Sequence, residues 1–149
     1  MRESYAWYNT EADMDAYLAE SFDLDRLRPD LADPKSHYFL ATRYGVVIGY
    51  AKLRHPRRKP RQLAHRRAIE LERIYVRASA QGLGAGRRLL DGCVAAARQL
   101  DYETLYLGVW EKNPGAAAFY RYVGFQRFGW HYFWFGADRQ RDFWMKLDL

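Results

Sequence analysis

Three glycines between a predicted strand and a predicted helix form the clearest candidate site for chemistry in this sequence. The stretch reads Gln81-Gly-Leu-Gly-Ala-Gly-Arg-Arg88. Glycines let a ligand approach the backbone closely, and the free amides and dipole of a helix start bind phosphate oxygens. The stretch lacks the Gly-Lys-Ser/Thr of a Walker loop and the spacing of a dinucleotide fingerprint. It therefore predicts a phosphate site of another kind or, without a ligand, a tight turn.

A second stretch places two aromatic residues at the end of a helix of small residues. It runs from Asn113-Pro114 to Gly124-Phe125 and contains Phe119 and Tyr120 after three alanines. Asn as cap and Pro in the first turn start a helix, and Gly ends one. The phenol of Tyr120 could donate a proton to a leaving group, or Tyr120 is an ordinary core aromatic.

Several carboxylates and one histidine are candidate proton acceptors. Glu70 and Glu72 lie two residues apart in a predicted strand and so share a face, while Glu111 ends the next strand beside Trp110. We take Glu72 as the first candidate for a general base, with Glu70, Glu111 and His131 as alternatives. The structural explanation for each carboxylate is an ion pair with a nearby arginine. The four histidines show no recurring spacing, so the sequence predicts no metal site.

The elements that must position these residues alternate between strands and helices, which predicts an α/β fold with helices covering a sheet. A hairpin is expected around Gly45, and Cys93 falls on the apolar stripe of a long helix, as a core residue. One domain spanning residues 1–149 is expected from the length. The expected strands cover 37–42, 46–53, 69–77, 104–110, 125–135 and 141–147, and the expected helices cover about 10–22, 24–31, 84–100 and 113–124.

Charge is distributed unevenly along the chain. The net charge is +6, but residues 54–67 hold seven of the 24 basic residues and no acid, whereas residues 1–33 hold nine acids and three bases. Residues 54–67, the basic segment, predict either a solvated loop or, as a rival function, a nucleic-acid-binding surface. A single cysteine excludes an internal disulfide and favours the cytoplasm, and no run is long enough for a membrane helix.

Together, the two stretches resemble the signatures of the GNAT family of acetyl-CoA-dependent N-acetyltransferases. The first signature is Gln-x-x-Gly-x-Gly, and the second is Asn-x-x-Ala-x-x-Phe-Tyr-x-x-x-Gly-Phe; every fixed position is filled here. The resemblance implies a GNAT-like, mixed, mostly antiparallel sheet flanked by helices. It also implies an acyltransferase that moves an acetyl group from acetyl-CoA, its co-substrate, to a primary amine by direct attack.

The resemblance also implies roles for individual residues. In the family the glycine loop wraps the pyrophosphate of coenzyme A, and the preceding strand splays from the next to admit the pantetheine arm. Ile74 and Val76 would bond the cofactor through the backbone, and Tyr120 would protonate the leaving thiolate, with Glu72 as the base. The residues expected at the cofactor are Ile74, Tyr75, Val76, Gln81, Gly82, Leu83, Gly84, Ala85, Gly86, Arg87, Asn113, Phe119 and Tyr120. Those expected at the acceptor are Glu70, Trp110, Glu111 and His131.

Three further segments are similar to the PaiA-type branch, whose members acetylate polyamines such as spermidine. They are residues 71–76, 107–113 and the tail from His131 to Asp142. This similarity predicts a small aliphatic amine as acceptor, with a protein, amino-acid or antibiotic amine as the alternative. The basic segment is then expected to lie away from an acidic acceptor mouth, where it would assist the phosphates of coenzyme A. Compared with the family, the first strand and helix are expected to be missing, and the open sheet edge invites a homodimer.

Overall fold

The computed structural model describes residues 33–149. The helices expected at 10–22 and 24–31, and the expected lack of a first strand and helix, lie outside these residues. The described elements, in chain order, are β1 (Ser36–Arg43), β2 (Val46–Arg54), the 3-10 helix η1 (Arg61–Leu63), β3 (Ala68–Val76), the 3-10 helix η2 (Ala78–Ala80), α3 (Ala85–Gln99), β4 (Thr104–Trp110), α4 (Pro114–Val123), β5 (Gln126–Phe135) and β6 (Asp138–Asp148).

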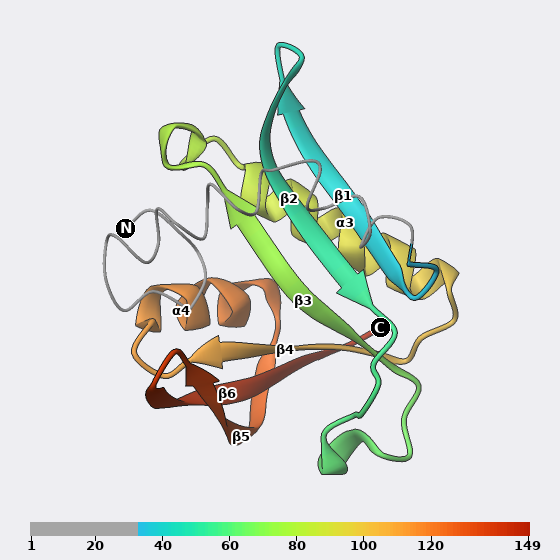
Figure 1. Ribbon diagram of the computed structural model, residues 1–149. Helices are drawn as coiled ribbons and strands as arrows, with labels where there is room; N and C mark the ends of the chain where they lie inside the picture. The colour runs from blue at the N-terminus through green and yellow to red at the C-terminus, as the bar shows by residue number, and fades with distance from the viewer. Residues whose placement is uncertain (1–32) are drawn as a thin grey trace.

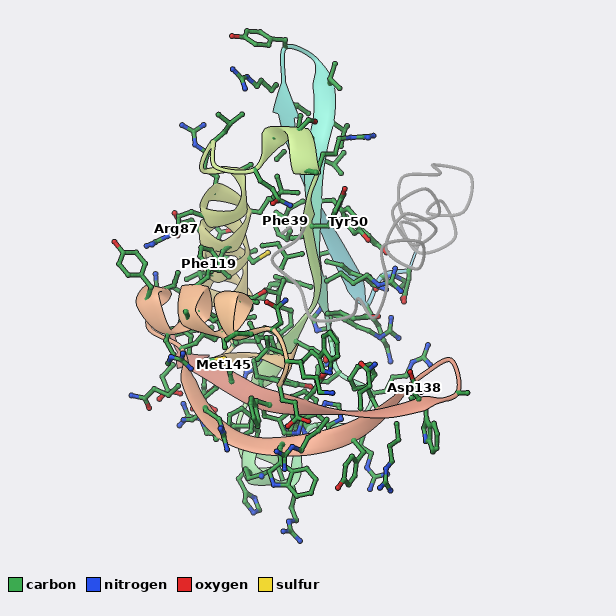
Figure 2. The ribbon with its side chains drawn as sticks, turned by 90° about the vertical axis from the view of Figure 1, so that its left-hand side faces the viewer. Phe39, Tyr50, Arg87, Phe119, Asp138 and Met145 are labelled. Carbon is green, nitrogen blue, oxygen red and sulfur yellow. The ribbon has the colours of Figure 1, made fainter. Side chains whose placement is uncertain are left out.

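The strands form one six-stranded sheet in the order β1-β2-β3-β4-β6-β5. Every neighbouring pair is antiparallel except β3 and β4, which are parallel. Helices α3 and α4 pack on the same face (Figure 1), and the turned view places Arg87 and Phe119 on that side and Tyr50 on the other (Figure 2). The predicted mixed, mostly antiparallel sheet with flanking helices is therefore confirmed.

The β1–β2 hairpin turns at Tyr44 and Gly45, both of which have positive φ, 52° and 77°. Two residues with positive φ make a type I′ turn, whose twist matches that of the strands it joins. Glycine adopts this conformation without strain, which explains Gly45 at the second position. The turn predicted around Gly45 is confirmed, one residue shorter than expected.

The main core lies between the sheet and the two helices. Alternate residues of β4 and β6, among them Leu107, Val109 and Met145, pack against α3 and α4 there. Cys93 of α3 is fully buried in this core, as predicted, and burial raises the pKa of its thiol to about 12. The remaining residues of these strands face the other way. We call that side, which carries Tyr106, Gly108 and Trp144, the far face.

The basic segment is a connection with many exposed residues, as expected of a solvated loop, but the fold anchors it at several positions. Its 3-10 helix buries Leu63 against Tyr106 on the far face, with Trp144 packed alongside. Arg66 donates to Thr104 Oγ1 and pairs with Asp148, while Lys59 donates to the carbonyl of Arg66. The segment enters β3 at the strand's N-terminal end, whereas the glycine stretch follows its C-terminal end (Figure 1). The expectation that the basic segment assists the cofactor phosphates is therefore wrong, because the segment and the glycine stretch lie at opposite ends of β3.

Within residues 33–149, no helix has the length and apolar character needed to cross a membrane.

Candidate active site

The central feature of the site is a gap between the two parallel strands. β3 has nine residues and β4 has seven, but they pair at only three positions, the last being Glu70 opposite Tyr106. Beyond that position the strands diverge, as the family resemblance predicts. The sheet therefore opens toward the C-terminal ends of β3 and β4, next to the starts of α3 and α4.

A β-bulge at Glu72 changes the direction of β3 where the gap begins. Lys52 of β2 lies opposite Arg73 and Leu53 lies opposite Leu71, so Glu72 is the additional residue. Bulges bend a strand and redirect its side chains, and they are common beside active sites. After the bulge, Ile74 and Val76 face the main core, while Tyr75 lies near Tyr50 on the opposite side.

The backbone of β3 presents alternate peptide groups to the gap. The amide of Arg77 donates to the carbonyl of Ile48 in β2, so the peptide groups of Tyr75 also face β2. Those of Ile74 and Val76 then face the opposite side, from which β4 has diverged. Gln81 Nε2 donates to the Val76 carbonyl at 3.1 Å and fixes the loop that follows. Ile74 and Val76 thus lie where the resemblance expects backbone bonds, and Tyr75 does not.

A pocket of about 400 Å³ opens at the start of α3. α3 begins after Gly84, which has φ +82°, and no side chain of residues 33–149 caps its first amides or places an acid in its first turn. Uncapped amides at a helix start bind anions, so the pocket fits a pyrophosphate. Arg87, which also lines the pocket, pairs with Asp91 at 3.0 Å. Eight of the expected cofactor residues line the pocket, and they are Val76, Gln81, Gly82, Gly84, Ala85, Gly86, Arg87 and Phe119.

Other residues expected at the cofactor lie elsewhere. Leu83 lines a separate groove of about 520 Å³ between β1 and α3. The side chain of Asn113 is buried and accepts a hydrogen bond from Ala116 N at 3.1 Å, so it caps α4, as predicted for the helix start. Tyr120 is 1% exposed and packs edge-on against Phe119 and Phe125. It belongs to the main core, to which Ile74 and Val109 contribute from the two strands that border the gap.

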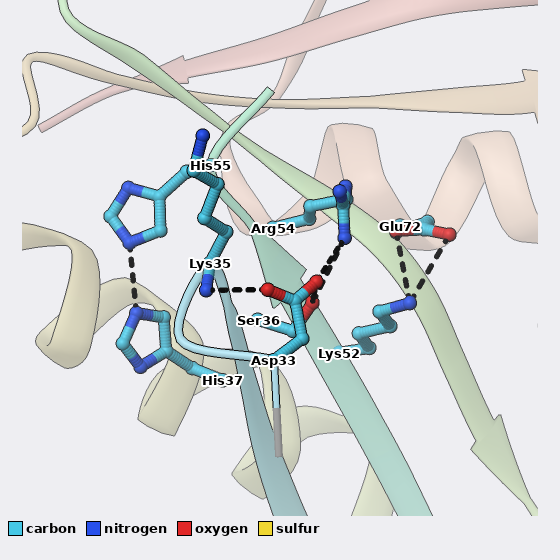
Figure 3. Close-up of polar contacts among 8 residues, drawn as sticks. All are labelled: Asp33, Lys35, Ser36, His37, Lys52, Arg54, His55 and Glu72. Carbon is cyan, nitrogen blue, oxygen red and sulfur yellow. Dashed lines mark hydrogen bonds and ion pairs between the residues drawn. The ribbon is translucent and has the colours of Figure 1, made fainter. Parts of the chain in front are cut away.

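Two of the predicted carboxylates form ion pairs. Lys52 Nζ lies 3.4 Å from Glu72 Oε2, and its side chain is only 4% exposed (Figure 3). Arg141 lies 2.7 Å from Glu111 Oε2 at the end of β4. Trp110, beside Glu111, is half-buried and packs against the main core. The expected arginine partner is therefore present for Glu111, whereas the partner of Glu72 is a lysine.

Two further carboxylates on the far face have no such partner. Within residues 33–149, neither Glu70 nor Asp142 forms an ion pair with a lysine or arginine. Burial, and then the neighbouring Glu72 carboxylate, raise the pKa of Glu70 to about 7. Burial, and then Glu70, raise the pKa of Asp142 to about 7. His131, stacked on Trp144 at 3.9 Å between ring centres, lies beside Asp142, and burial lowers its pKa.

Three residues near the site received no role from the sequence. Lys52 pairs with Glu72 from 20 positions away, which no local pattern reveals. Asp142 lies in a strand in which buried and exposed residues alternate, and the only sign of a role in the sequence is a polar residue at a position expected to be buried. Gly108 interrupts β4 and leaves room for side chains from other strands.

Sequence comparisons identify relatives along most of the chain. The profile of the Acetyltransferase (GNAT) family matches residues 1–125. An uncharacterized N-acetyltransferase of Lactobacillus delbrueckii subsp. lactis is 36% identical over 141 residues, which cover 95% of this chain and 81% of the relative. The N-alpha-acetyltransferase RimI of Mycobacterium tuberculosis is 39% identical over 100 residues, which cover 67% of this chain and 58% of that protein.

Solved structures share the fold. The ribosomal-protein-alanine N-acetyltransferase of Brucella melitensis has a TM-score of 0.68 and 26% identity, over 95% of this chain and 98% of that chain. The PaiA N-acetyltransferase of Thermoplasma acidophilum, solved with coenzyme A, also has a TM-score of 0.68, with 17% identity over 94% of this chain and 80% of that chain. Since 17% identity shows the fold alone, the polyamine branch is not established by this likeness. The splayed strands, the uncapped helix start and these relatives together establish that the chain belongs to the GNAT family and is an acetyl-CoA-dependent N-acetyltransferase.

Proposed function

We propose that this protein acetylates the α-amino group of a protein or peptide N-terminus, an acceptor that carries one ammonium group at the site of transfer. The observation that supports this acceptor is the charge balance around the gap. Glu72 is paired with Lys52, and Glu111 with Arg141, so that, within residues 33–149, Glu70 and Asp142 are the carboxylates around the gap without a lysine or arginine partner. With pKa values near 7, these two carboxyls hold little more than one negative charge at neutral pH.

Other features of the far face also favour a single amine over a polycation. Arg54 and Lys52 both act on Glu70 and lower its pKa, against the larger effects that raise it. The basic segment is anchored on the same face through Leu63. A polycation would meet these positive groups, whereas a peptide chain can extend past them with its own carbonyls and carboxylates. The relatives named for N-alpha and ribosomal-protein-alanine acetylation support the same acceptor class.

Different residues bind the cofactor, accept the proton of the amine and protonate the leaving thiolate. The amides at the start of α3 and Arg87 hold the pyrophosphate, and the backbone of Ile74 and Val76 aligns the pantetheine arm in the gap. A proton acceptor on the far face takes the proton that the ammonium must lose before attack. Tyr120, in the core beside the gap, donates its phenolic proton to the departing sulfur.

A polyamine remains the second candidate acceptor, and one observation favours it. Three carboxylates lie close together on one face. Glu72 raises the pKa of Glu70, and Glu70 raises the pKa of Asp142. Such a row of carboxylates can bind a chain with spaced ammonium groups.

The experiment is an acetyl-CoA turnover assay with matched acceptors. They are an unblocked peptide, the same peptide with a blocked N-terminus and an internal lysine, spermidine, and an aminoglycoside. We expect the unblocked peptide to have the highest kcat/KM, with the acetyl group located on the α-amine by mass spectrometry. Turnover confined to spermidine would favour the second candidate, and turnover confined to the aminoglycoside or to the lysine would contradict both.

A further inference from the structure

Gly108 creates a space over the middle of β4 that side chains from two other strands fill. A Cβ atom at this position would lie 3.0 Å from Asp142 Oδ2, 3.4 Å from His131 Nε2 and 3.4 Å from an edge carbon of Trp144. The strand register explains the meeting, since Trp144 lies opposite Gly108, and Asp142 opposite His131. Only a glycine allows the carboxylate and the imidazole to lie this close to the backbone of β4.

The two side chains meet through atoms that both carry lone pairs. His131 Nδ1 lies 3.1 Å from the carbonyl oxygen of Tyr132, so Nδ1 bears the hydrogen of the neutral ring and Nε2 bears the lone pair. Nε2 points at Asp142 Oδ2, 3.7 Å away. His131 Nε2 and Asp142 Oδ1 are both buried and have no hydrogen-bond partner among residues 33–149. Buried polar atoms without partners are rare and often mark a functional role.

The pair borders the gap. The last paired position of the parallel strands is Glu70 opposite Tyr106; the next residues, Leu71 and Leu107, belong to the main core, and Glu72 and Gly108 follow them. The bulge redirects Glu72 on one side, and the Asp142–His131 pair covers Gly108 on the other. The Asp142 side chain is 16% exposed and that of His131 is 33% exposed, although the Nε2 atom itself is buried.

Among residues 33–149, the proton acceptors of the far face without a lysine or arginine partner are Glu70 and this pair, and only the pair lies over Gly108. Glu72 is neutralised by a cation at ion-pair distance, and Glu70 raises the proton affinity of Asp142. The charged groups of the surrounding elements are Lys52 and Arg54 on β2, Glu70 and Glu72 on β3, Glu111 after β4, and Arg141 on β6, which pairs with Glu111.

We propose that the His131–Asp142 pair over Gly108 accepts the proton that the amine loses before it attacks the thioester. The imidazole Nε2 receives the proton, and the carboxylate stabilises the imidazolium. This inference rests on the proposed function and assigns to the pair the step that the sequence assigned to Glu72, because Glu72 already forms an ion pair with Lys52.

The protons balance in this scheme. The ammonium R–NH₃⁺ gives one proton to the pair, which passes it to solvent. The neutral amine forms the C–N bond as the C–S bond breaks, and the thiolate takes the phenolic proton of Tyr120. The second proton, released from the amide nitrogen, returns to the tyrosinate. The products are the acetylated amine, the free thiol of coenzyme A and one proton.

The test compares Asp142→Asn, His131→Gln and the double variant with the wild-type protein, using the amine that the turnover assay identifies. Asp138→Asn, an exposed carboxylate on the same strand, is the matched control. The ratio of wild-type to variant kcat/KM is measured against pH, because the ionisation of the amine is common to both proteins and cancels. Acetyl-CoA affinity, measured by calorimetry, verifies that each variant folds.

We expect each single variant to lose about 10²-fold in kcat/KM above neutral pH, with the loss disappearing as the pair becomes protonated below about pH 6. The double variant should be no worse than either single one, because the two side chains act as a unit. If Asp142→Asn does not fold, the test rests on His131→Gln, because the His131 side chain is partly exposed.

Three results would overturn the proposal. A loss independent of pH would assign the pair a structural role only. Variants as active as the wild type would remove the pair from the reaction while leaving the proposed function intact. A wild-type protein that binds acetyl-CoA but acetylates none of the amines would overturn the proposed function and, with it, the role of the pair.

Discussion

Replacing Asp142 with asparagine should change how the stability of the protein depends on pH. Burial raises the pKa of this carboxyl from its usual 3.8 to about 7. Between these values the folded protein keeps a proton that the unfolded chain has lost. The free energy of unfolding therefore falls as the pH rises through this window, and above about pH 7 it stays at the lower level. An amide, which does not titrate, removes this dependence.

The size of the effect follows from the window. Between about pH 5 and about pH 8, the folded and unfolded states differ by one bound proton over roughly two pH units, and each unit is about 1.36 kcal/mol. The free energy of unfolding of the wild-type protein should therefore fall by roughly 3 kcal/mol more than that of Asp142→Asn over this pH range. For a domain of this size the difference corresponds to roughly 6–12 °C in Tm. Glu70 titrates in both proteins, so its contribution largely cancels in the comparison.

The assay is urea unfolding of wild type and Asp142→Asn at about pH 5 and about pH 8, with Asp138→Asn as control. We expect the free energy of unfolding of the control to follow the wild type at both pH values. If wild type and Asp142→Asn lose the same stability between the two pH values, Asp142 is not a buried carboxyl with a raised pKa. The charge balance of the far face would then have to be revised.

Two further variants test the cofactor site and the proton donor. Gly86→Val adds a side chain where only Val76 Cγ2 lies near, 3.8 Å from the new Cβ, so the chain should fold while acetyl-CoA affinity falls at least about tenfold by calorimetry. Unchanged affinity would exclude the glycine loop from binding. Tyr120→Phe should lower kcat by about 10²-fold with acetyl-CoA affinity unchanged, because a proton donor acts in the transition state. A loss below about threefold would assign Tyr120 to core packing.

Local signals predicted most of the fold. The β4 strand at Thr104–Trp110 and the helix between Asn113 and Gly124 match the prediction, because apolar runs and capping residues are read from neighbouring positions. β6 begins at Asp138 rather than at residue 141, since its first residues are polar and pair with an equally exposed β5. The basic segment was harder to predict, because a single leucine, Leu63, anchors it.

The candidate site was predictable only where it is continuous in sequence. The glycine loop is local, and six of its expected residues line the pocket. The acceptor side is assembled from different strands. The ion pair of Lys52 with Glu72, and the meeting of His131 and Asp142 over Gly108, depend on strand order and on a bulge, which are long-range properties. A position in a sequence motif does not always line the site. Leu83 lines the groove between β1 and α3, and the Asn113 side chain caps α4.

The divergence of β3 and β4 also divides the sheet into two mechanical halves. β1, β2 and β3 form one triplet, β4, β6 and β5 the other, and only three residue pairs join them along the sheet. A molecule that lies in the gap and bonds to both strands therefore connects the two triplets, and part of its binding free energy stabilises their association. Amide hydrogen exchange in β3 beyond Glu70 should slow when acetyl-CoA is added, as should exchange in β4 beyond Tyr106, whereas the β1–β2 turn should be unaffected. Filling the gap also covers two facing strand edges, which are otherwise templates for pairing with other chains.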